Sequence, residues 1–163
     1  MSKPNQDVQF KRLYSDAEGL DQFRKLNEVF AEAFDDKDTY LGDKPSDDYL
    51  FSLLQKDPVL ACVALVDQEV VAGLVAYVLD KFEQERKEVY IYDLAVDVNY
   101  RRQKVATNLI HFLNEEALKL GAWVVYVQAD RDDPPAMQLY ESLGSREEVY
   151  HYDIRLEKVP KEQ

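Results

Sequence analysis

The stretch "YIYDLAVDVNYRRQKVATNLI", residues 90–110, joins an apolar strand to a segment with the pattern of a helix. Three basic residues, Arg101, Arg102 and Lys104, stand at the start of that predicted helix. A helix N-terminus has a partial positive charge and free N–H groups, so acidic residues normally occupy its first turn. Cations beside free N–H groups are suited to binding a phosphate. A basic turn that arose by chance is the alternative.

The residues on both sides of this turn predict a strand, a helix and a second strand. Residues 88–96, "EVYIYDLAV", and 122–129, "AWVVYVQA", are rich in β-branched and aromatic residues, as strands are. Gly121 ends the helix between them. Two strands joined in this way form a parallel crossover unit. The apolar face of the helix comprises Val105, Leu109, Phe112, Leu113, Ala117 and Leu120.

The rest of the chain supplies further strands and helices around this unit. A single α/β (α+β) domain over residues 1–163 is expected, with a mixed, mostly antiparallel sheet flanked by helices and loose tails at 1–7 and 157–163. The predicted strands are 8–14, 59–66, 70–79 and 147–156. The predicted helices are 46–55, 134–144 and one that starts at the capping-box pattern "SDAE" (15–18) and reaches Phe34.

The chain is strongly acidic, with a net charge of −12. This charge repels nucleic acid and favours a polycationic partner, although acidity can also serve solubility alone. The sequence has neither a long apolar stretch nor an apolar signal-peptide core, so no membrane insertion and a cytoplasmic location are expected.

Cysteine and histidine are too few for several kinds of site. Cys62 is the only cysteine and lies in the apolar run "VLACVALV", where it is expected to pack as a small hydrophobic residue. With only His111 and His151 besides, no set of Cys and His has metal-ligand spacing. Metal and serine-hydrolase chemistry are therefore not expected.

The order of elements and the string "RRQKVA" (101–106) resemble the GNAT superfamily of acetyl-CoA-dependent N-acetyltransferases. The family signature is R/Q-x-x-G-x-G/A, which Arg101 and Ala106 match, while Lys104 replaces the first glycine. The resemblance implies that this turn holds the pyrophosphate of coenzyme A. A lysine with helical dihedrals could still direct its N–H at the phosphate. The implied cofactor-binding residues are Leu94, Ala95, Val96, Arg101, Arg102, Gln103, Lys104, Val105, Ala106 and Thr107.

Several longer strings resemble one branch of this superfamily, the aminoglycoside 3-N-acetyltransferases that act on gentamicin. They are "KFEQ", "YIYDLAV", "YRRQ", "YVQAD" with "DDP" after it, "LYESLG" and "REEVYHYDI". This resemblance implies acetylation of the 3-amino group of a polycationic antibiotic, and hence resistance. It also implies a homodimer, for which the aromatic-rich stretch "VYHYDI" (149–154) of the last predicted strand could supply an interface, or the same strand could simply finish the sheet.

The resemblance assigns the proton transfers to two side chains. Asp93 matches the base that accepts the proton of the amine, and Tyr140 matches the acid that protonates the departing thiolate. The backbone N–H groups of Leu94 and Val96 would polarise the thioester carbonyl. The alternatives are a carboxylate at a strand end satisfied by backbone donors, and a merely packed aromatic ring.

Strand parity places Asp93 on the same face as Val89, Ile91 and Ala95, if no bulge intervenes. That apolar setting would raise the pKa of the carboxyl, and a bound polycation would lower it again. The residues expected to bind substrate are Tyr92, Asp132, Asp133, Glu147, Glu148 and Asp153, any of which could be an ordinary solvated side chain. Rival functions are acetylation of a polyamine or protein amine, and a non-catalytic module that binds coenzyme A or a cation.

Overall fold

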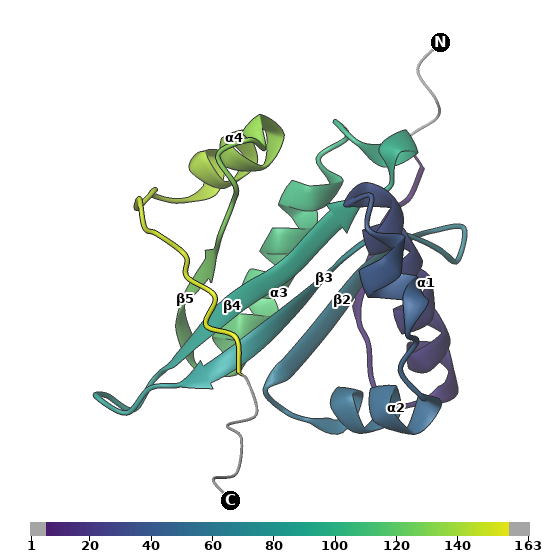
Figure 1. Cartoon of the computed structure of the whole chain (residues 1–163), viewed down its shortest axis with the longest axis horizontal. Helices are drawn as coiled ribbons and strands as arrows, with labels where there is room; N and C mark the ends of the chain where they lie inside the picture. Colours follow the sequence, from purple (N-terminus) through teal and green to yellow (C-terminus); the bar gives the residue numbers. More distant parts are fainter. Residues whose placement is uncertain (1–5, 157–163) are drawn as a thin grey trace, which may run out of the picture.

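The computed structural model of the protein describes residues 6–156, which form one five-stranded sheet with helices on both faces (Figure 1). Along the chain the elements are β1 (Gln9–Arg12), α1 (Ala17–Ala33), the π-helical turn η1 (Asp38–Gly42), α2 (Asp47–Gln55), β2 (Val59–Val66), β3 (Glu69–Asp80), β4 (Lys87–Val96), the 3₁₀ turn η2 (Val98–Tyr100), α3 (Val105–Lys119), β5 (Ala122–Val127) and α4 (Pro134–Leu143).

The strands lie in the order β1-β2-β3-β4-β5. Neighbouring strands are antiparallel from β1 to β4, and β5 runs parallel to β4. Helix α3 makes the crossover between the parallel pair, because parallel strands cannot be joined by a tight turn. The mixed, mostly antiparallel sheet predicted from the sequence is therefore confirmed.

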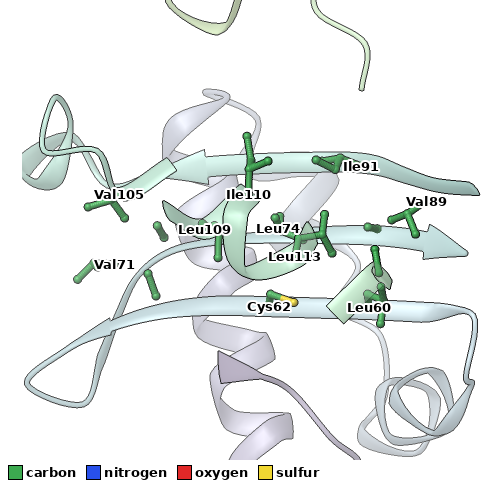
Figure 2. Packing of buried hydrophobic residues seen from close by; sticks show 14 of the residues in the cluster. Leu60, Cys62, Val71, Leu74, Val89, Ile91, Val105, Leu109, Ile110 and Leu113 are labelled. Atoms are coloured by element: carbon green, nitrogen blue, oxygen red, sulfur yellow. The ribbon is translucent and has the colours of Figure 1, made fainter. Parts of the chain in front are cut away.

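One layer of the core lies between the sheet and α3 (Figure 2). Val105, Leu109 and Leu113 project from the helix onto the sheet, where Leu74 and Ile91 are among their neighbours in the buried cluster. The spacing of these helix residues is that of one buried face, as the sequence predicts. We call this side of the sheet the α3 face.

The other layer lies between the sheet and helices α1 and α2, on what we call the α1 face. Phe23, Leu26 and Phe30 of α1 pack there against β2 and β3. Gly73 of β3 makes close packing possible: a Cβ at this position would lie 2.3 Å from Cδ1 of Leu26 and 2.8 Å from the carbonyl oxygen of Cys62. The missing side chain thus sets how closely α1 approaches the sheet.

The predicted last strand, residues 147–156, is wrong. The chain from 145 to 156 has no regular secondary structure, and the sheet ends at β5. Alternation of apolar and polar residues suits a strand but does not supply a hydrogen-bonding neighbour. The apolar side chains of this segment stay 70–97% exposed; they are Val149, Tyr150, Tyr152, Ile154 and Leu156.

Smaller differences concern the ends of elements. Strand β1 is shorter than the predicted 8–14, and β5 ends two residues before the predicted 129. Asp16 caps α1 by accepting a hydrogen bond from the N–H of Gly19 at 2.7 Å, so Ser15 is not the cap. The tails predicted at 1–7 and 157–163 lie almost wholly outside the described residues.

Replacing Gly73 with alanine should destabilise the fold, because the added methyl group overlaps Leu26 and the Cys62 carbonyl oxygen. Overpacking of this kind costs about 1–3 kcal/mol, and each kcal/mol lowers Tm by roughly 2–4 °C in a domain of this size. Urea unfolding of Gly73→Ala measures the loss. Gly42→Ala is the matched control, since no atom lies within 4 Å of its Cβ position. Equal stability of the two variants would contradict this account of α1 packing.

Candidate active site

A β-bulge in β4 positions the candidate base. Val75 of β3 pairs with Asp93 and the next residue, Ala76, pairs with Ile91, so Tyr92 is an extra residue. The extra residue shifts the alternation of side chains between the two faces of the sheet. Val89 and Ile91 face α3, whereas Asp93 and Ala95 face α1. The predicted grouping of Asp93 with Val89 and Ile91 is therefore corrected, while its grouping with Ala95 holds.

Asp93 is partly buried and hydrogen-bonded to a side chain from another layer. The hydroxyl of Tyr40 donates to Oδ2 of Asp93 at 2.8 Å. Burial raises the pKa of the Asp93 carboxyl, and the bond from Tyr40 opposes this rise. The expected rise in pKa is confirmed, although the surrounding residues differ from those predicted. A carboxylate with a raised pKa is better suited to accept a proton than a fully solvated one.

Tyr40 is a residue that sequence reasoning missed. It lies in η1, in a segment that reads only as polar, and no motif marks it. Its ring packs against Phe30 of α1 and against Phe34, the C-cap of that helix, at centroid distances of 5.6 and 5.8 Å. Burial and the bond to Asp93 raise the pKa of Tyr40, so its hydroxyl keeps its proton and acts as a donor. The α1 layer thereby holds the candidate base in place.

Beyond the bulge, β4 has a free edge. Pairing with β5 stops at Ile91, while pairing with β3 continues to Val96. The N–H of Asp97 donates to Val71 of β3 at 2.8 Å, so alternation turns the N–H groups of Leu94 and Val96 away from β3. The Val96 carbonyl oxygen accepts from Nε of Arg101 at 3.1 Å, which agrees with that direction. Two backbone donors therefore lie on the edge of β4 that extends past the end of β5.

The basic turn lies just before α3, which begins at Val105. Asp16, Ser46 and Asp133 cap the other three α-helices with their side chains, but no side chain caps α3. Its first N–H groups, those of residues 104–107, remain available because the ladder starts with Asn108 donating to Lys104. This arrangement suits an anion. The cations thus precede the helix and do not occupy its first turn.

Lys104 has left-handed dihedrals, with φ 60° and ψ 18°, so the expected helical conformation is wrong. Arg102 also has a φ of 60°. Left-handed backbone costs a non-glycine residue roughly 1–2 kcal/mol, which explains why the family signature has glycine at the position of Lys104. The turn therefore keeps the backbone shape that glycine would favour and adds an ammonium group.

Tyr140 lies in α4 and packs against the cluster on the α3 face, opposite to the face of Asp93. Burial, with a smaller effect from Asp133, raises the pKa of its hydroxyl. Asp133 accepts from the N–H of Ala136 at 3.2 Å and caps α4, so it has a structural role. The candidate acid and base thus come from the two faces of the sheet.

The remaining predicted substrate residues are less well defined. Tyr92 is an exposed residue of the bulge, adjacent to Asp93. Asp132 lies in the turn before α4 and is exposed. Glu147, Glu148 and Asp153 are exposed in the irregular segment after α4, where Asp153 bonds His151 at 2.9 Å. No regular element holds these three carboxylates next to Asp93.

Other kinds of site find little support in residues 6–156. No group of three or more metal-binding side chains could hold an ion within this part of the chain. Burial raises the pKa of the Cys62 thiol to about 12, so this residue is a poor nucleophile. None of the helices in the same part of the chain is long and apolar enough to span a membrane.

Comparison with known proteins identifies the family. The model of the acetyltransferase (GNAT) family matches residues 23–144. An aminoglycoside acetyltransferase from an uncultured soil metagenomic sample is 44% identical, with a TM-score of 0.90 over 93% of this chain and 99% of that one. A second, solved with sisomicin from such a sample, is 32% identical, with a TM-score of 0.85 over 92% and 97%.

A curated human relative, N-alpha-acetyltransferase 30, is 32% identical over 87 residues, which are 53% of this chain but only 24% of the human protein. The match to the family model spans the bulge, the free edge of β4, the basic turn and α4. The chain belongs to the GNAT family of acetyltransferases, whose acetyl donor is acetyl-CoA.

Proposed function

We propose that the protein transfers the acetyl group of acetyl-CoA to the 3-amino group of aminoglycosides of the gentamicin type, and so confers resistance. The substrate class is supported by the 44% identity to an aminoglycoside acetyltransferase over nearly the whole chain. The single structural observation that carries the chemistry is Asp93, held by Tyr40 on the bulge of β4 beside a free strand edge.

Asp93 accepts a proton from the ammonium group of the substrate in the first step. The amine nitrogen then attacks the thioester carbonyl carbon, and the new C–N bond gives a tetrahedral intermediate. This intermediate collapses as the C–S bond breaks, and the nitrogen releases its second proton, which leaves a neutral amide and coenzyme A. Partial burial raises the pKa of Asp93, which brings it closer to that of a useful base. Before the transfer, the carboxylate attracts the cationic amine.

Two further groups act on the thioester. The N–H groups of Leu94 and Val96 stabilise negative charge on the carbonyl oxygen as the tetrahedral intermediate forms. Tyr140 donates its proton to the departing thiolate. Because the pKa of the tyrosine is raised above its usual ~10 and that of a thiol is ~8.5, this transfer is uphill by itself, and the proton that the acetylated nitrogen releases restores the tyrosine and completes it. Because Tyr140 and Asp93 come from opposite faces of the sheet, base and acid can act on opposite sides of a thioester placed at the unpaired edge of β4.

The pyrophosphate of coenzyme A is assigned to the turn 101–104 and the first N–H groups of α3. One N–H of the Arg101 guanidinium is already used there, because Nε donates to the Val96 carbonyl oxygen at 3.1 Å. Arg102 and Lys104 are exposed and supply positive charge in an otherwise acidic protein. The homodimer and the cytoplasmic location stay predictions.

Acetylation of a protein amine is the second candidate. It is favoured by the 32% identity to the human N-alpha-acetyltransferase over 87 residues. A polyamine is a further acceptor that the same acidic protein could take, and acceptor profiling separates all three. The non-catalytic alternative rests on Lys104, which departs from the family signature.

Replacing Asp93 with asparagine should lower kcat/KM for gentamicin and sisomicin by about 10²-fold or more, because the base is lost. The folded-state pKa of Asp93 lies above its unfolded value, so its ionisation costs stability at pH values above the folded pKa and not below the unfolded one. The Asp93→Asn variant should therefore be no less stable than the wild type at pH 8. Thiol release from acetyl-CoA and thermal unfolding measure the two effects.

The same assay, run with kanamycin, spermidine and a peptide with a free N-terminus, discriminates among the acceptors. If only the peptide or only spermidine is acetylated, that amine is the acceptor and the proposed antibiotic substrate is wrong. If no acceptor supports thiol release although the wild type binds coenzyme A, the binding-module alternative holds and the proposed reaction is wrong.

Replacing Tyr40 with phenylalanine should move the acidic limb of the kcat/KM profile to higher pH. The hydroxyl stabilises the carboxylate form of Asp93, so its removal raises the pKa of the base and reduces the ionised fraction at low pH. Activity above the limb should change little. Tyr77→Phe is the control. This tyrosine lies on the same face, but its ring contacts Tyr92, and the hydroxyl that bonds Asp93 is that of Tyr40. An unshifted limb in Tyr40→Phe would exclude Tyr40 as the residue that tunes the base.

Replacing Lys104 tests whether its charge or its backbone shape matters. Lys104→Ala keeps the left-handed strain and removes the ammonium, so KM for acetyl-CoA should rise several-fold, most clearly at low salt. Lys104→Gly removes the charge and the strain together, and should unfold at a higher temperature than Lys104→Ala. An unchanged KM in the alanine variant would show that the ammonium does not bind the pyrophosphate.

A further inference from the structure

Four tyrosines form a continuous row across three strands next to Asp93. They are Tyr77 of β3, Tyr90 and Tyr92 of β4, and Tyr126 of β5. Tyr92 makes edge-to-face contacts with Tyr77 and Tyr90, at centroid distances of 6.0 and 5.9 Å. Tyr90 stacks on Tyr126 at 4.8 Å, with the ring planes 10° apart. We call these four residues the tyrosine row.

The tyrosine row lies on the α1 face of the sheet. The neighbours of Tyr90 in the strand, Val89 and Ile91, pack on the α3 face, so Tyr90 points the other way. Val125 and Val127 likewise pack toward α3, which turns Tyr126 to the α1 face. The bulge then keeps Tyr92 on the same face as Asp93.

Helices α1 and α2 leave this part of the α1 face largely uncovered. Helix α1 packs chiefly against β2, β3 and β4, and the helix that packs on β5 is α3, on the opposite face. In Figure 1 only the irregular segment after α4 passes in front of β4 there, and its side chains are largely exposed. Tyr92 remains 64% exposed and Tyr126 38%. Cross-strand aromatic pairs stabilise sheets, but that role does not require open ring faces.

The charge and polarity around the tyrosine row favour a cationic ligand. Asp93 lies close enough to contribute to the raised pKa of both Tyr77 and Tyr90. The hydroxyl of Tyr90 donates to Oε1 of Gln128 at 3.0 Å, so a polar group borders the rings. Aromatic faces attract cations and pack against C–H groups, and the chain carries a net charge of −12. The complementary ligand is a cation with a saturated ring.

We infer that the tyrosine row is a ring-binding subsite for the acceptor, which places a second ring of a multi-ring polyammonium substrate against Tyr92 while Asp93 receives the reacting amine. The inference rests on the proposed acetyl transfer at Asp93. The C–H face of a saturated ring stacks on the exposed tyrosine, and its ammonium groups lie over the electron-rich faces. A linear amine offers no such face, so the row discriminates by ring number as well as by charge.

The test compares Tyr92→Ala with the wild type on sisomicin, on 2-deoxystreptamine, which is a single aminocyclitol ring, and on spermidine. We expect KM for sisomicin to rise tenfold or more with kcat within threefold. For the single ring and the linear amine, kcat/KM should stay within threefold, because neither reaches the row. Tyr92→Phe keeps the ring and should retain wild-type KM. Tyr14→Ala, at the opposite edge of the sheet, removes a similarly exposed tyrosine and should have no effect.

Calorimetric titration with sisomicin separates failure of this inference from failure of the proposed function. If the wild type acetylates sisomicin and Tyr92→Ala does so with unchanged KM, the row is not a subsite, and the proposed function stands. An equal loss on sisomicin and 2-deoxystreptamine would show that Tyr92 only supports Asp93, which also overturns the inference. If the wild type neither acetylates nor binds sisomicin, the proposed function and the subsite are both wrong.

Discussion

The single extra residue in β4 is the constraint on which the site depends. Without the bulge at Tyr92, strict alternation would place Asp93 with Val89 and Ile91 beneath α3, inside a close-packed apolar layer. With it, the strand contributes apolar residues to α3 on both sides of the bulge and still presents a carboxylate to the other face. The same irregularity coincides with the end of pairing to β5, which leaves the strand edge free.

The electrostatics of the site follow from this position. Asp93 loses part of its hydration, which favours the neutral acid, and gains a hydrogen bond from Tyr40, which favours the carboxylate. The balance keeps the carboxyl ionisable but less acidic than a solvated aspartate. At the other end of the proposed cofactor site, α3 lacks a side-chain cap, and the turn before it has two left-handed residues. The proposed site therefore runs from unpaired N–H groups on the edge of β4 to a strained turn and the free N–H groups of α3.

Much of this arrangement could be predicted from local sequence. The periodicity of 105–120 gives the buried face of α3, the apolar run 59–66 gives a buried strand, and "RRQKVA" marks the turn before an α3 that has no side-chain cap. The bulge could not be predicted, because one residue more or less in a strand leaves no compositional signal. Tyr40 was missed because its role comes from a contact across 53 residues. The prediction of a strand at 147–156 was wrong because alternation alone cannot indicate whether a partner strand exists.

The close approach of α1 at Gly73 has a consequence for how relatives of this protein can diverge. The helix that rests on Gly73 carries Phe30 and has Phe34 as its C-cap; Tyr40 packs against both rings and partly offsets the rise that burial causes in the pKa of Asp93. A change of side-chain volume at the helix–sheet interface would shift the tyrosine relative to the carboxylate. Adaptation to the acidity of a habitat can thus proceed through apolar substitutions in the core, while every residue that meets the substrate remains the same.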